Sequence, residues 1–497
     1  MATDLFKVDQ VSEEIRMSRT GEQYIESLRD GRTVFLNGEK VTNHVDHPAF
    51  RNVIRTAASL YDYQAEHADQ MRFETPGGKN VGLYWELPDT REKLIARGNA
   101  AYALATRSGG WLGRSPDHVA SVITGMITHL EVFEEYSRDR AEALKNYYLY
   151  ARDKDLYLAF TLVNPQGDRS KTPSEHTKNL FHSLGVLEEK PQGIIVRGTK
   201  MLGTAAVLAE EVFVSVFNPL KESADDKYAL SFALPLNTKG IKILSRKSYE
   251  IGSNKFDSPL AHQFDENDAV IYFDDVLVPW ERVFVYKNID MCRRQFESTA
   301  AEVLGDGQSL ARYAVKLHFL AGLAHALTEA TGVNEVPAVR ESLAELACYA
   351  TNIEGLFRGL FHNPDRHNGY YIPNQLQLYA CQVVAQSIYP KVIEIIRKLS
   401  GGGVIMLPSS YVDFANPEIR CLIEKTQYST LLEPIERVKL LKLVWDAVGS
   451  EFVSRHIQYE MFYSGAHFVA LSRLYGRYDW NLAKSMSKEI LDSISVN

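Results

Sequence analysis

The sequence predicts an α+β fold that is mainly helical, because the spacing of its apolar residues changes twice along the chain. From about residue 48 to 155 the pattern is helical. From 156 to 286 short β-branched and aromatic runs alternate with turn formers, and beyond about 305 long apolar helices return. We therefore expect an N-terminal helical domain (1–155), a central β-barrel or sandwich (156–286) and a C-terminal helical bundle (287–497).

Two helices are predicted in the N-terminal domain, one on each side of residues 107–114. Asp89 and Glu92 have capping-box spacing, which predicts a helix that runs to the glycine pair 109–110. Ser115 as N-cap and Pro116 as the first helical residue predict the start of the next helix, which continues with apolar residues at helical spacing.

Arg114 lies immediately before this second helix, and His118 lies in its first turn. A permanent cation, a titratable imidazole and free backbone N–H groups therefore gather at one point, which suits an anion such as a phenolate. An ordinary capped helix with an exposed arginine and histidine would give the same local pattern. The local residues alone leave both interpretations open.

The central domain is predicted to contain several short strands separated by turn formers such as Pro165, Gly198, Asn237 and Gly240. The expected strands lie within residues 156–163, 193–196, 212–217, 228–234, 241–244 and 269–273. Beyond them, a stripe that includes Leu310, Ala314 and Leu317 is typical of a long helix in a bundle.

Composition argues against several classes of function. The net charge of −8 and the sequence pI of about 6.0 give no basic footprint for nucleic acid. No apolar run is long enough for a membrane span, and the first ten residues, MATDLFKVDQ, lack the apolar core of a signal peptide. The four cysteines are widely spaced with no C-x-x-C pair, so we expect no metal site and a reducing cytoplasmic location.

A series of short motifs, in order along nearly the whole chain, resembles the 4-hydroxyphenylacetate 3-hydroxylase family. Each motif is weak alone, and their common order makes the resemblance specific. They are TGEQY (20–24) with DGR (30–32), HPAFR (47–51), GRSPD (113–117), VNPQ (163–166), FDEND (264–268), VPWE (278–281), LPSS (407–410) and YSG (463–465).

The resemblance implies an acyl-CoA-dehydrogenase-like fold and the oxygenase component of a two-component flavin monooxygenase. Such an enzyme uses FAD as FADH2 with O2, hydroxylates a small aromatic, phenolic substrate through a flavin C4a-hydroperoxide, and forms a homotetramer. An NAD(P)H:flavin reductase supplies the FADH2. The sequence has no G-x-G-x-x-G between a strand and a helix, which agrees with a separate reductase.

The resemblance also assigns residues to the flavin. Gln166 and Arg169 follow the first strand of the central domain and offer amide and guanidinium groups. Thr204 corresponds to a threonine that contacts the isoalloxazine ring in relatives, and Ser464 and Gly465 match a C-terminal turn that contacts the flavin. A polar turn, a strand threonine and a plain helix end are the structural alternatives for these positions.

The predicted phenol site departs from the family pattern at two positions. Arg114 is kept, the family tyrosine is His118, and the family histidine on the strand is Phe160. Ionising a phenol at pH 7 costs about 4 kcal/mol, because its pKa lies near 10. Either the imidazole has moved from strand to helix and still takes this proton, or Phe160 marks a more apolar pocket for another substrate. We prefer the first interpretation.

The substrate tail is less defined. The loop at residues 251–260 is shorter than the family loop that holds a carboxylate, so Ser253 and Asn254 are candidates for a polar tail and Tyr286 for a further pocket residue. A surface loop and strand packing are the alternatives.

The sequence leaves three other functions as alternatives. They are a flavin acyl-CoA dehydrogenase, a hydroxyacyl-CoA dehydratase, which needs cysteine ligands that residues 90–110 lack, and a non-catalytic scaffold.

Overall fold

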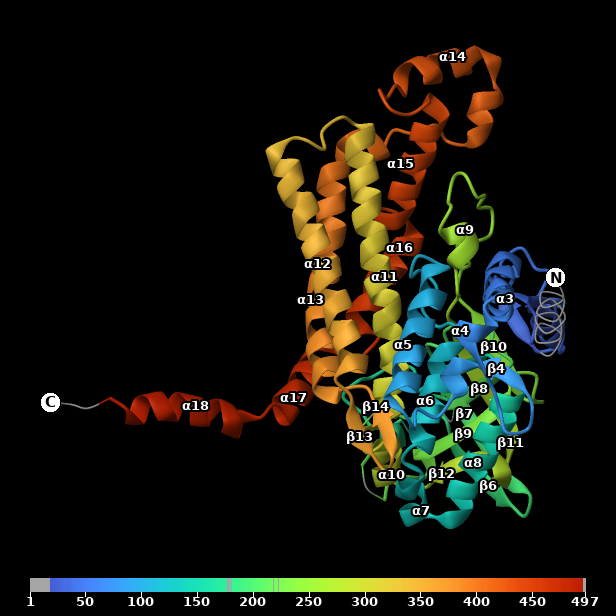
Figure 1. The fold of residues 1–497 in the computed structure, drawn as a ribbon. Helices are drawn as coiled ribbons and strands as arrows, with labels where there is room; N and C mark the ends of the chain where they lie inside the picture. The colour runs from blue at the N-terminus through green and yellow to red at the C-terminus, as the bar shows by residue number, and fades with distance from the viewer. Residues whose placement is uncertain (1–17, 177–178, 180, 218, 222, 495–497) are drawn as a thin grey trace, which may run out of the picture.

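The computed structural model describes residues 18–494, apart from 177, 178, 180, 218 and 222. It confirms the predicted mixture of helices and sheets, mainly helical, with a β region between two sets of helices (Figure 1). The prediction about residues 1–10 falls outside the described residues. In the part that is described, no helix combines the length and apolar character that crossing a bilayer requires.

The N-terminal region is mainly helical. Helix α5 forms where it was predicted, but its cap is Thr90 and not Asp89: the Thr90 hydroxyl accepts a hydrogen bond from the backbone N–H of Lys93, while the Asp89 carboxylate binds the Lys93 side chain. The helices are α2 (Gly21–Ser27), α3 (Arg51–Glu66), α4 (Ala68–Met71), α5 (Arg91–Thr106), α6 (Asp117–Ile127), α7 (Leu130–Tyr136) and α8 (Arg138–Asp153), with a hairpin of β3 (Arg72–Glu74) and β4 (Asn80–Gly82).

The central region contains two sheets that pack through their apolar faces. Six strands pair in the order β2-β1-β10-β11-β7-β6, and four pair in the order β12-β9-β8-β5. Their bounds are β1 (Val34–Leu36), β2 (Glu39–Val41), β5 (Leu158–Thr161), β6 (Gly185–Lys190), β7 (Gly193–Lys200), β8 (Glu211–Val214), β9 (Leu230–Pro235), β10 (Ile241–Ser245), β11 (Ala269–Pro279) and β12 (Val283–Tyr286).

Strands β1 and β2 come from the part of the chain that was expected to be helical. β1 pairs in parallel with β10, with Val34 opposite Ile243, and β2 forms the sheet edge. The sequence signal was weak because each strand has only three residues. The N-terminal segment is therefore part of the central sheet, and the predicted boundary at residue 155 remains a prediction.

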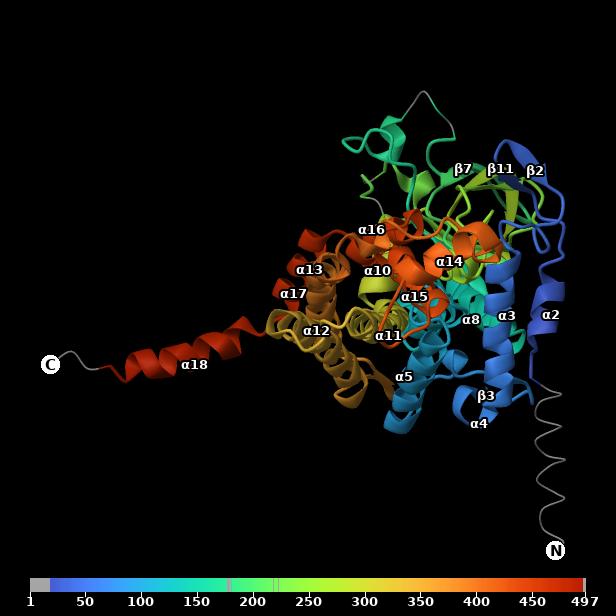
Figure 2. The same cartoon turned by 90° about the horizontal axis from the view of Figure 1, so that it is seen from above.

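The C-terminal region is a bundle built around α11, which is buried along most of its length (Figure 2). Its helices are α10 (Ile289–Glu297), α11 (Ala301–Ala330), α12 (Pro337–His362), α13 (Gln375–Ser400), α14 (Pro417–Thr426), α15 (Pro434–Val448), α16 (Glu451–Phe462), α17 (His467–Arg477) and α18 (Trp480–Asp492), with a hairpin of β13 (Asp365–His367) and β14 (Tyr370–Ile372). In both views α18 stands clear of the rest of the chain (Figures 1 and 2).

Candidate active site

A tight passage against α11 brings Arg114 into the interior. Gly109 and Gly110 adopt φ values of +56° and +77°, and a Cβ on Gly110 would lie 2.4 Å from the carbonyl oxygen of Arg312. Only glycine permits this conformation at this separation without strain. The chain then turns through residues 111–116 into α6, so the end of α5 fixes where the predicted site begins.

The start of α6 differs from its prediction at two residues, Ser115 and Pro116. Ser115 does not cap the helix, because its hydroxyl donates to the Asp117 carboxylate (2.5 Å) and accepts from the side-chain amide of Gln308 on α11 (2.8 Å). The helix begins at Asp117, with Pro116 immediately before it. The competing carboxylate two residues away explains the difference, and the contact with Gln308 ties this corner to the bundle.

Arg114 and His118 form one polar pair. The Arg114 guanidinium donates a hydrogen bond to Nε2 of His118, whose side chain is buried, while His118 Nδ1 is buried without a partner among the described residues. Burial and the positive charges of Arg114 and Arg312 lower the pKa of His118 well below its ordinary value. The imidazole is therefore neutral at pH 7.

Phe160 and Thr204 complete the same neighbourhood. The Phe160 ring lies 6.2 Å from the His118 ring, and its other ring neighbours are Phe213 (5.7 Å) and Phe296 (6.1 Å). Residues 160 and 204 face each other in an antiparallel β-bridge. The structure thus joins four predicted residues, which we call the Arg114 cluster: Arg114, His118, Phe160 and Thr204.

The Arg114 guanidinium has no carboxylate partner among the described residues. Its own backbone N–H donates to Glu266 Oε2 (2.7 Å), but the side chain instead faces His118 and the ring of Tyr459, whose centroid lies 5.4 Å from the guanidinium carbon. Arg114 is half-buried. A half-buried cation that forms no ion pair among the described residues is suited to bind an anion from outside the chain.

A second set of charges, which sequence reasoning did not identify as a site, lies directly beside this cluster. Arg455 binds both carboxylate oxygens of Asp268 (2.6 and 2.9 Å) and one of Glu266 (2.5 Å). Arg246 binds Asp265 (2.6 Å) and Asp268 (2.9 Å). The FDEND motif at 264–268 was the available signal, and it marks an ion-pair network that supports the site.

Thr204 links the two groups of residues. Its hydroxyl donates to Oδ1 of Asp268 (2.7 Å), and the side chain is 9% exposed. Although burial opposes ionisation, Arg455, Arg246 and this hydroxyl hold the pKa of Asp268 far below its ordinary value. Thr204 is thereby held in one orientation next to Phe160.

Gln166 and Arg169 lie in the loop after β5, and both residues are exposed. This loop starts beside the end of β7, because the backbone N–H of Met201 donates to the carbonyl of Val163 (2.9 Å). The two residues therefore lie toward the same end of the central sheets as Thr204. Among the described residues, no hydrogen bond joins either of them to the Arg114 cluster.

Ser464 and Gly465 form the turn that follows α16. The side-chain amide of Gln386 donates to Ser464 Oγ (3.1 Å) and to the Gly465 carbonyl (2.8 Å). Gly465 has φ +93°, a conformation that favours glycine. Because Tyr459 on the same helix faces Arg114, α16 connects this turn to the cluster.

The structure does not bring the remaining candidates to Arg114. Ser253 donates to the carbonyl of Glu250 (2.6 Å), and Asn254 donates to Asp257 (2.6 Å), so both use polar atoms to shape their own loop. Tyr286, on β12, packs edge-on against Trp280, with ring centroids 5.2 Å apart. β12 and the Phe160 strand β5 are opposite edges of the four-stranded sheet.

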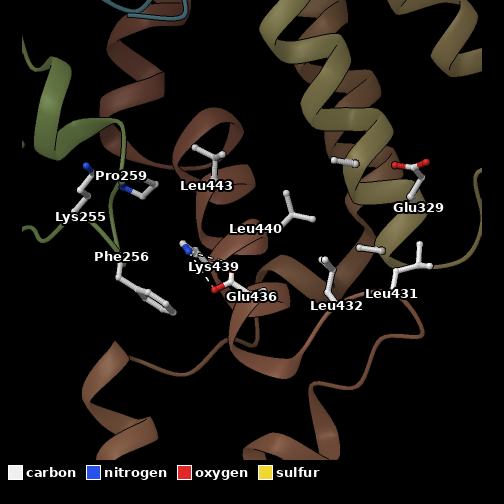
Figure 3. Close-up of a pocket in the computed structure, with 12 residues that line it drawn as sticks. Lys255, Phe256, Pro259, Glu329, Leu431, Leu432, Glu436, Lys439, Leu440 and Leu443 are labelled. Atoms are coloured by element: carbon white, nitrogen blue, oxygen red, sulfur yellow. Dashed lines mark hydrogen bonds and ion pairs between the residues drawn. The ribbon is translucent and has the colours of Figure 1, made fainter.

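The loop after Glu250 instead borders a cavity of about 700 Å³ between α11 and α15 (Figure 3). Lys255, Phe256 and Pro259 come from the loop, while Leu440 and Leu443 come from α15. The walls are mostly apolar, and no residue of the Arg114 cluster lines the cavity. It is a separate feature of the bundle.

Comparison with known proteins shows which family this chain resembles. Models described as "4-hydroxyphenylacetate 3-hydroxylase N terminal" and "C terminal" match residues 20–285 and 292–492. The chain is 36% identical to the 4-hydroxyphenylacetate 3-monooxygenase oxygenase component of Geobacillus sp. (strain PA-9), covering 90% of this chain and 91% of that protein. It is 35% identical to the 4-nitrophenol 2-monooxygenase oxygenase component of Rhodococcus sp., covering 94% and 90%.

Solved structures agree with the sequence relatives. The oxygenase component of 4-hydroxyphenylacetate 3-monooxygenase, complexed with FAD and 4-hydroxyphenylacetate, superposes with a TM-score of 0.90 at 33% identity, covering 96% of this chain and 98% of that one. An archaeal 4-hydroxybutyryl-CoA dehydratase from N. maritimus shares the fold with a TM-score of 0.87 at 20% identity, covering 96% of each chain. The chain belongs to the 4-hydroxyphenylacetate 3-hydroxylase family.

Proposed function

We propose that this chain is the oxygenase component of a two-component, FADH2-dependent monooxygenase in which Arg114 binds the oxygen of a small phenol as a phenolate. The observation that carries the proposal is the half-buried Arg114 guanidinium, which contacts a neutral imidazole and the Tyr459 ring and forms no ion pair with a carboxylate among the described residues. Relatives named as hydroxylating 4-hydroxyphenylacetate and 4-nitrophenol act on phenols, which supports the same substrate class here.

The surface beside Thr204 fits a flavin. Leu202 is 50% exposed with φ +57°, and it lies two residues before Thr204 and next to the loop that carries Gln166. An apolar side chain bordered by a hydroxyl and exposed amide groups matches a planar ring with polar edges. Reduced FAD bound here would react with O2 and supply the chemistry that transfers one oxygen atom of O2 to the substrate. A separate NAD(P)H:flavin reductase would provide the reduced flavin.

Arg114 would offset part of the free energy needed to ionise the phenol. Ionising a phenol at pH 7 costs about 4 kcal/mol, and one hydrogen bond between charged groups returns about 1.5–3 kcal/mol. Because the aromatic rings around the site keep the local dielectric low, the attraction between the guanidinium and a phenolate is stronger than in water. Binding through Arg114 therefore favours the ionised, electron-rich ring.

His118 is the proposed acceptor of the phenol proton at Nε2, whose lone pair accepts a hydrogen bond from Arg114 in the free protein and becomes available when the guanidinium turns to the phenolate. In the free enzyme its low pKa keeps it neutral and able to take a proton. A phenolate beside Arg114 would offset the positive charge that helps to lower the His118 pKa, so proton uptake becomes easier when the substrate ionises. Phe160, Phe213 and Phe296 exclude water from this side of the site.

Substituting Arg114 tests the proposal. Supplied with FADH2, O2 and a panel of phenols, Arg114→Leu should form hydroxylated product about 10²–10³-fold more slowly than the wild type. Arg140→Leu is the matched control: Arg140 is also half-buried, lies 5.2 Å from the Trp280 ring centroid and donates to backbone carbonyls. Full turnover by Arg114→Leu, or no product from any phenol with the wild type, would overturn the assignment.

We also propose that the enzyme is a homotetramer in which α18 packs against another copy. Helix α18 contains no buried residue and stands clear of the body of its own chain (Figures 1 and 2), and its exposed residues Leu482, Met486 and Ile490 follow the i, i+4 spacing of one helix face. An apolar helix face of this kind is typical of an interface. Light scattering should give a tetramer, and a chain ending at Tyr478 should give a smaller species; a monomeric full-length chain would contradict this.

The cytoplasmic location remains a prediction.

A further inference from the structure

A layer of buried charge lies behind the Arg114 cluster, between α11 and α16. Arg312 binds both oxygens of Glu460 (2.5 and 2.9 Å), and Lys316 binds the same carboxylate (2.6 Å) and His456 Nδ1 (3.2 Å). The side chains of Arg312, Lys316 and Glu460 are 0% exposed. Two buried cations therefore share one carboxylate, and the proposed chemistry uses none of these groups.

Tyr459 lies between this layer and Arg114. Three guanidinium carbons lie close to its ring centroid: Arg114 at 5.4 Å, Arg312 at 5.1 Å and Arg455 at 4.7 Å. The ring of Tyr463, one turn along the helix, stacks on it at 6.0 Å and 21°. The aromatic face is electron-rich and attracts each cation, so the ring is a common contact for three arginines.

These three arginines differ in what else holds them. Arg312 is fixed by Glu460, and Arg455 is fixed by Asp268 and Glu266, so both approach the ring from anchored positions. Among the described residues, the hydrogen bonds that anchor Arg114 are those of its backbone and the one to His118. The Tyr459 ring is therefore a main restraint on where the Arg114 guanidinium lies.

The backbone next to Arg114 fits the same ring closely. A Cβ on Gly113 would lie 2.7 Å from Glu266 Oε1 and 3.1 Å from two atoms of Tyr459, so the chain passes against the tyrosine where a larger residue would collide. The Tyr459 hydroxyl is buried and has no hydrogen-bond partner among the described residues. The contacts of this residue with Arg114 are thus made by its ring.

We propose that Tyr459 is a positioning residue, whose ring holds the Arg114 guanidinium in place to bind a phenolate. The inference rests on the proposed role of Arg114 and adds a residue from α16 to that site. It predicts that the ring is required and the hydroxyl is not, because the cation contacts the aromatic face.

The test measures phenolate binding without turnover. The probe is 4-nitrophenol, whose ionised form absorbs visible light, titrated with flavin-free and FAD-loaded protein over a range of pH. The wild type should lower the apparent pKa of the bound probe. Tyr459→Leu should weaken binding of the ionised probe about tenfold, which raises the apparent pKa of the bound probe by about one unit. Tyr459→Phe should stay within about twofold of the wild type.

Tyr389→Leu is the matched control for loosening of the bundle. Tyr389 is fully buried, its hydroxyl also lacks a partner among the described residues, and its ring lies 5.8 Å from the Lys316 ammonium. This variant should bind the probe like the wild type. Loss of binding in Tyr389→Leu equal to that in Tyr459→Leu would overturn the inference, because the effect would then be general.

Three further outcomes test this inference, and the first separates it from the proposed function. If Arg114→Leu weakens binding of the ionised probe and Tyr459→Leu does not, the role of Tyr459 is wrong and that of Arg114 stands. If Tyr459→Phe is as weak as Tyr459→Leu, the hydroxyl is the active group and the positioning role is wrong. If the wild type itself does not lower the pKa of the probe, the proposed function fails together with the inference.

Discussion

Two arginine environments lie side by side in this protein and differ in how their charge is balanced. Arg455 contacts two carboxylates, from Asp268 and Glu266, in a network that Arg246 and Asp265 extend. The Arg114 side chain contacts an imidazole and an aromatic ring, with no ion pair to it among the described residues. The first arrangement is complete within the chain, whereas the second is complete only when an anion arrives.

This contrast separates support from recognition. A buried cation that is fully paired contributes to specifying the fold, and removing it leaves carboxylates uncompensated. An unpaired cation contributes little to the fold and is available to a ligand. The two sites meet at Glu266, which binds the Arg455 side chain and the Arg114 backbone, so the paired network positions the unpaired arginine.

The largest expected effect is on stability, from Arg455→Leu. This change leaves buried Glu266 without its ion pair and Asp268 with Arg246 alone, so we expect a loss of about 3–5 kcal/mol in the free energy of unfolding, measured by urea denaturation. Arg197→Leu is the control, because its pair with Asp275 is on the surface and its loss should change the free energy of unfolding far less. Equal losses in the two variants would remove the distinction drawn here.

The next largest effect is on catalysis, from His118→Gln. Glutamine can still accept a hydrogen bond from Arg114, but it cannot take a proton. Product formation from a simple phenol should fall by about 10²-fold at pH 7 and recover as the pH rises toward the pKa of the free phenol. The pH profile of product formation under excess FADH2 gives the answer. A profile identical to that of the wild type would exclude His118 as the proton acceptor.

His118 should also make stability depend on pH. Its pKa is lowered in the folded state, so below about pH 6.5 the unfolded chain takes up a proton that the folded protein refuses. The stabilisation is complete above this pH and is lost as the pH falls toward the folded-state pKa. In this pH range the free energy of unfolding of His118→Gln, measured with urea, should fall by about 1.4 kcal/mol less per pH unit than that of the wild type. An unchanged slope would mean that His118 titrates normally.

A similar but local effect is expected from Thr204→Val, which removes one hydrogen bond to Asp268. We expect a loss of about 1.5 kcal/mol in the free energy of unfolding, because the bond is made to a charged group. Thr199→Val is a fair control, since Thr199 is buried and its hydroxyl makes no hydrogen bond in the described part of the chain. A smaller loss than in the control would show that Arg455 and Arg246 alone hold Asp268.

The smallest expected effect is on the stability of Arg114→Leu. Because this guanidinium has no carboxylate to leave behind, its removal should change the free energy of unfolding by less than about 1 kcal/mol. Urea denaturation beside Arg455→Leu gives the direct comparison. A loss as large as that of Arg455→Leu would mean that Arg114 is a structural residue after all.

Sequence patterns predicted the fold class and the location of the main strands because those features depend on local periodicity. The strands at residues 193–200, 230–235 and 269–279 fall where β-branched runs had been identified. The pairing of β1 with β10 could not be predicted in this way, since it joins residues about 200 positions apart through strands of three and five residues.

The site was predicted only in part for the same reason. Arg114 and His118 could be predicted from the sequence because they lie four residues apart at the start of one helix. Phe160 and Thr204 came from the family resemblance, and the structure places them beside His118 and Asp268. Tyr459 and Arg455 carry no local signal, because their importance arises from packing of α16 against a loop more than 300 residues earlier.

The parallel pairing of β1 with β10 also constrains how the protein is made. While the ribosome extends the chain, Val34 can pair early with Val41 of β2 but lacks its parallel partner until Ile243 has been synthesised, so the six-stranded sheet cannot close during the first half of translation. A gene split near residue 155 would likewise yield a fragment whose β10 edge is open to pairing with other chains. Co-expression of the two halves should be needed to keep either one from aggregating.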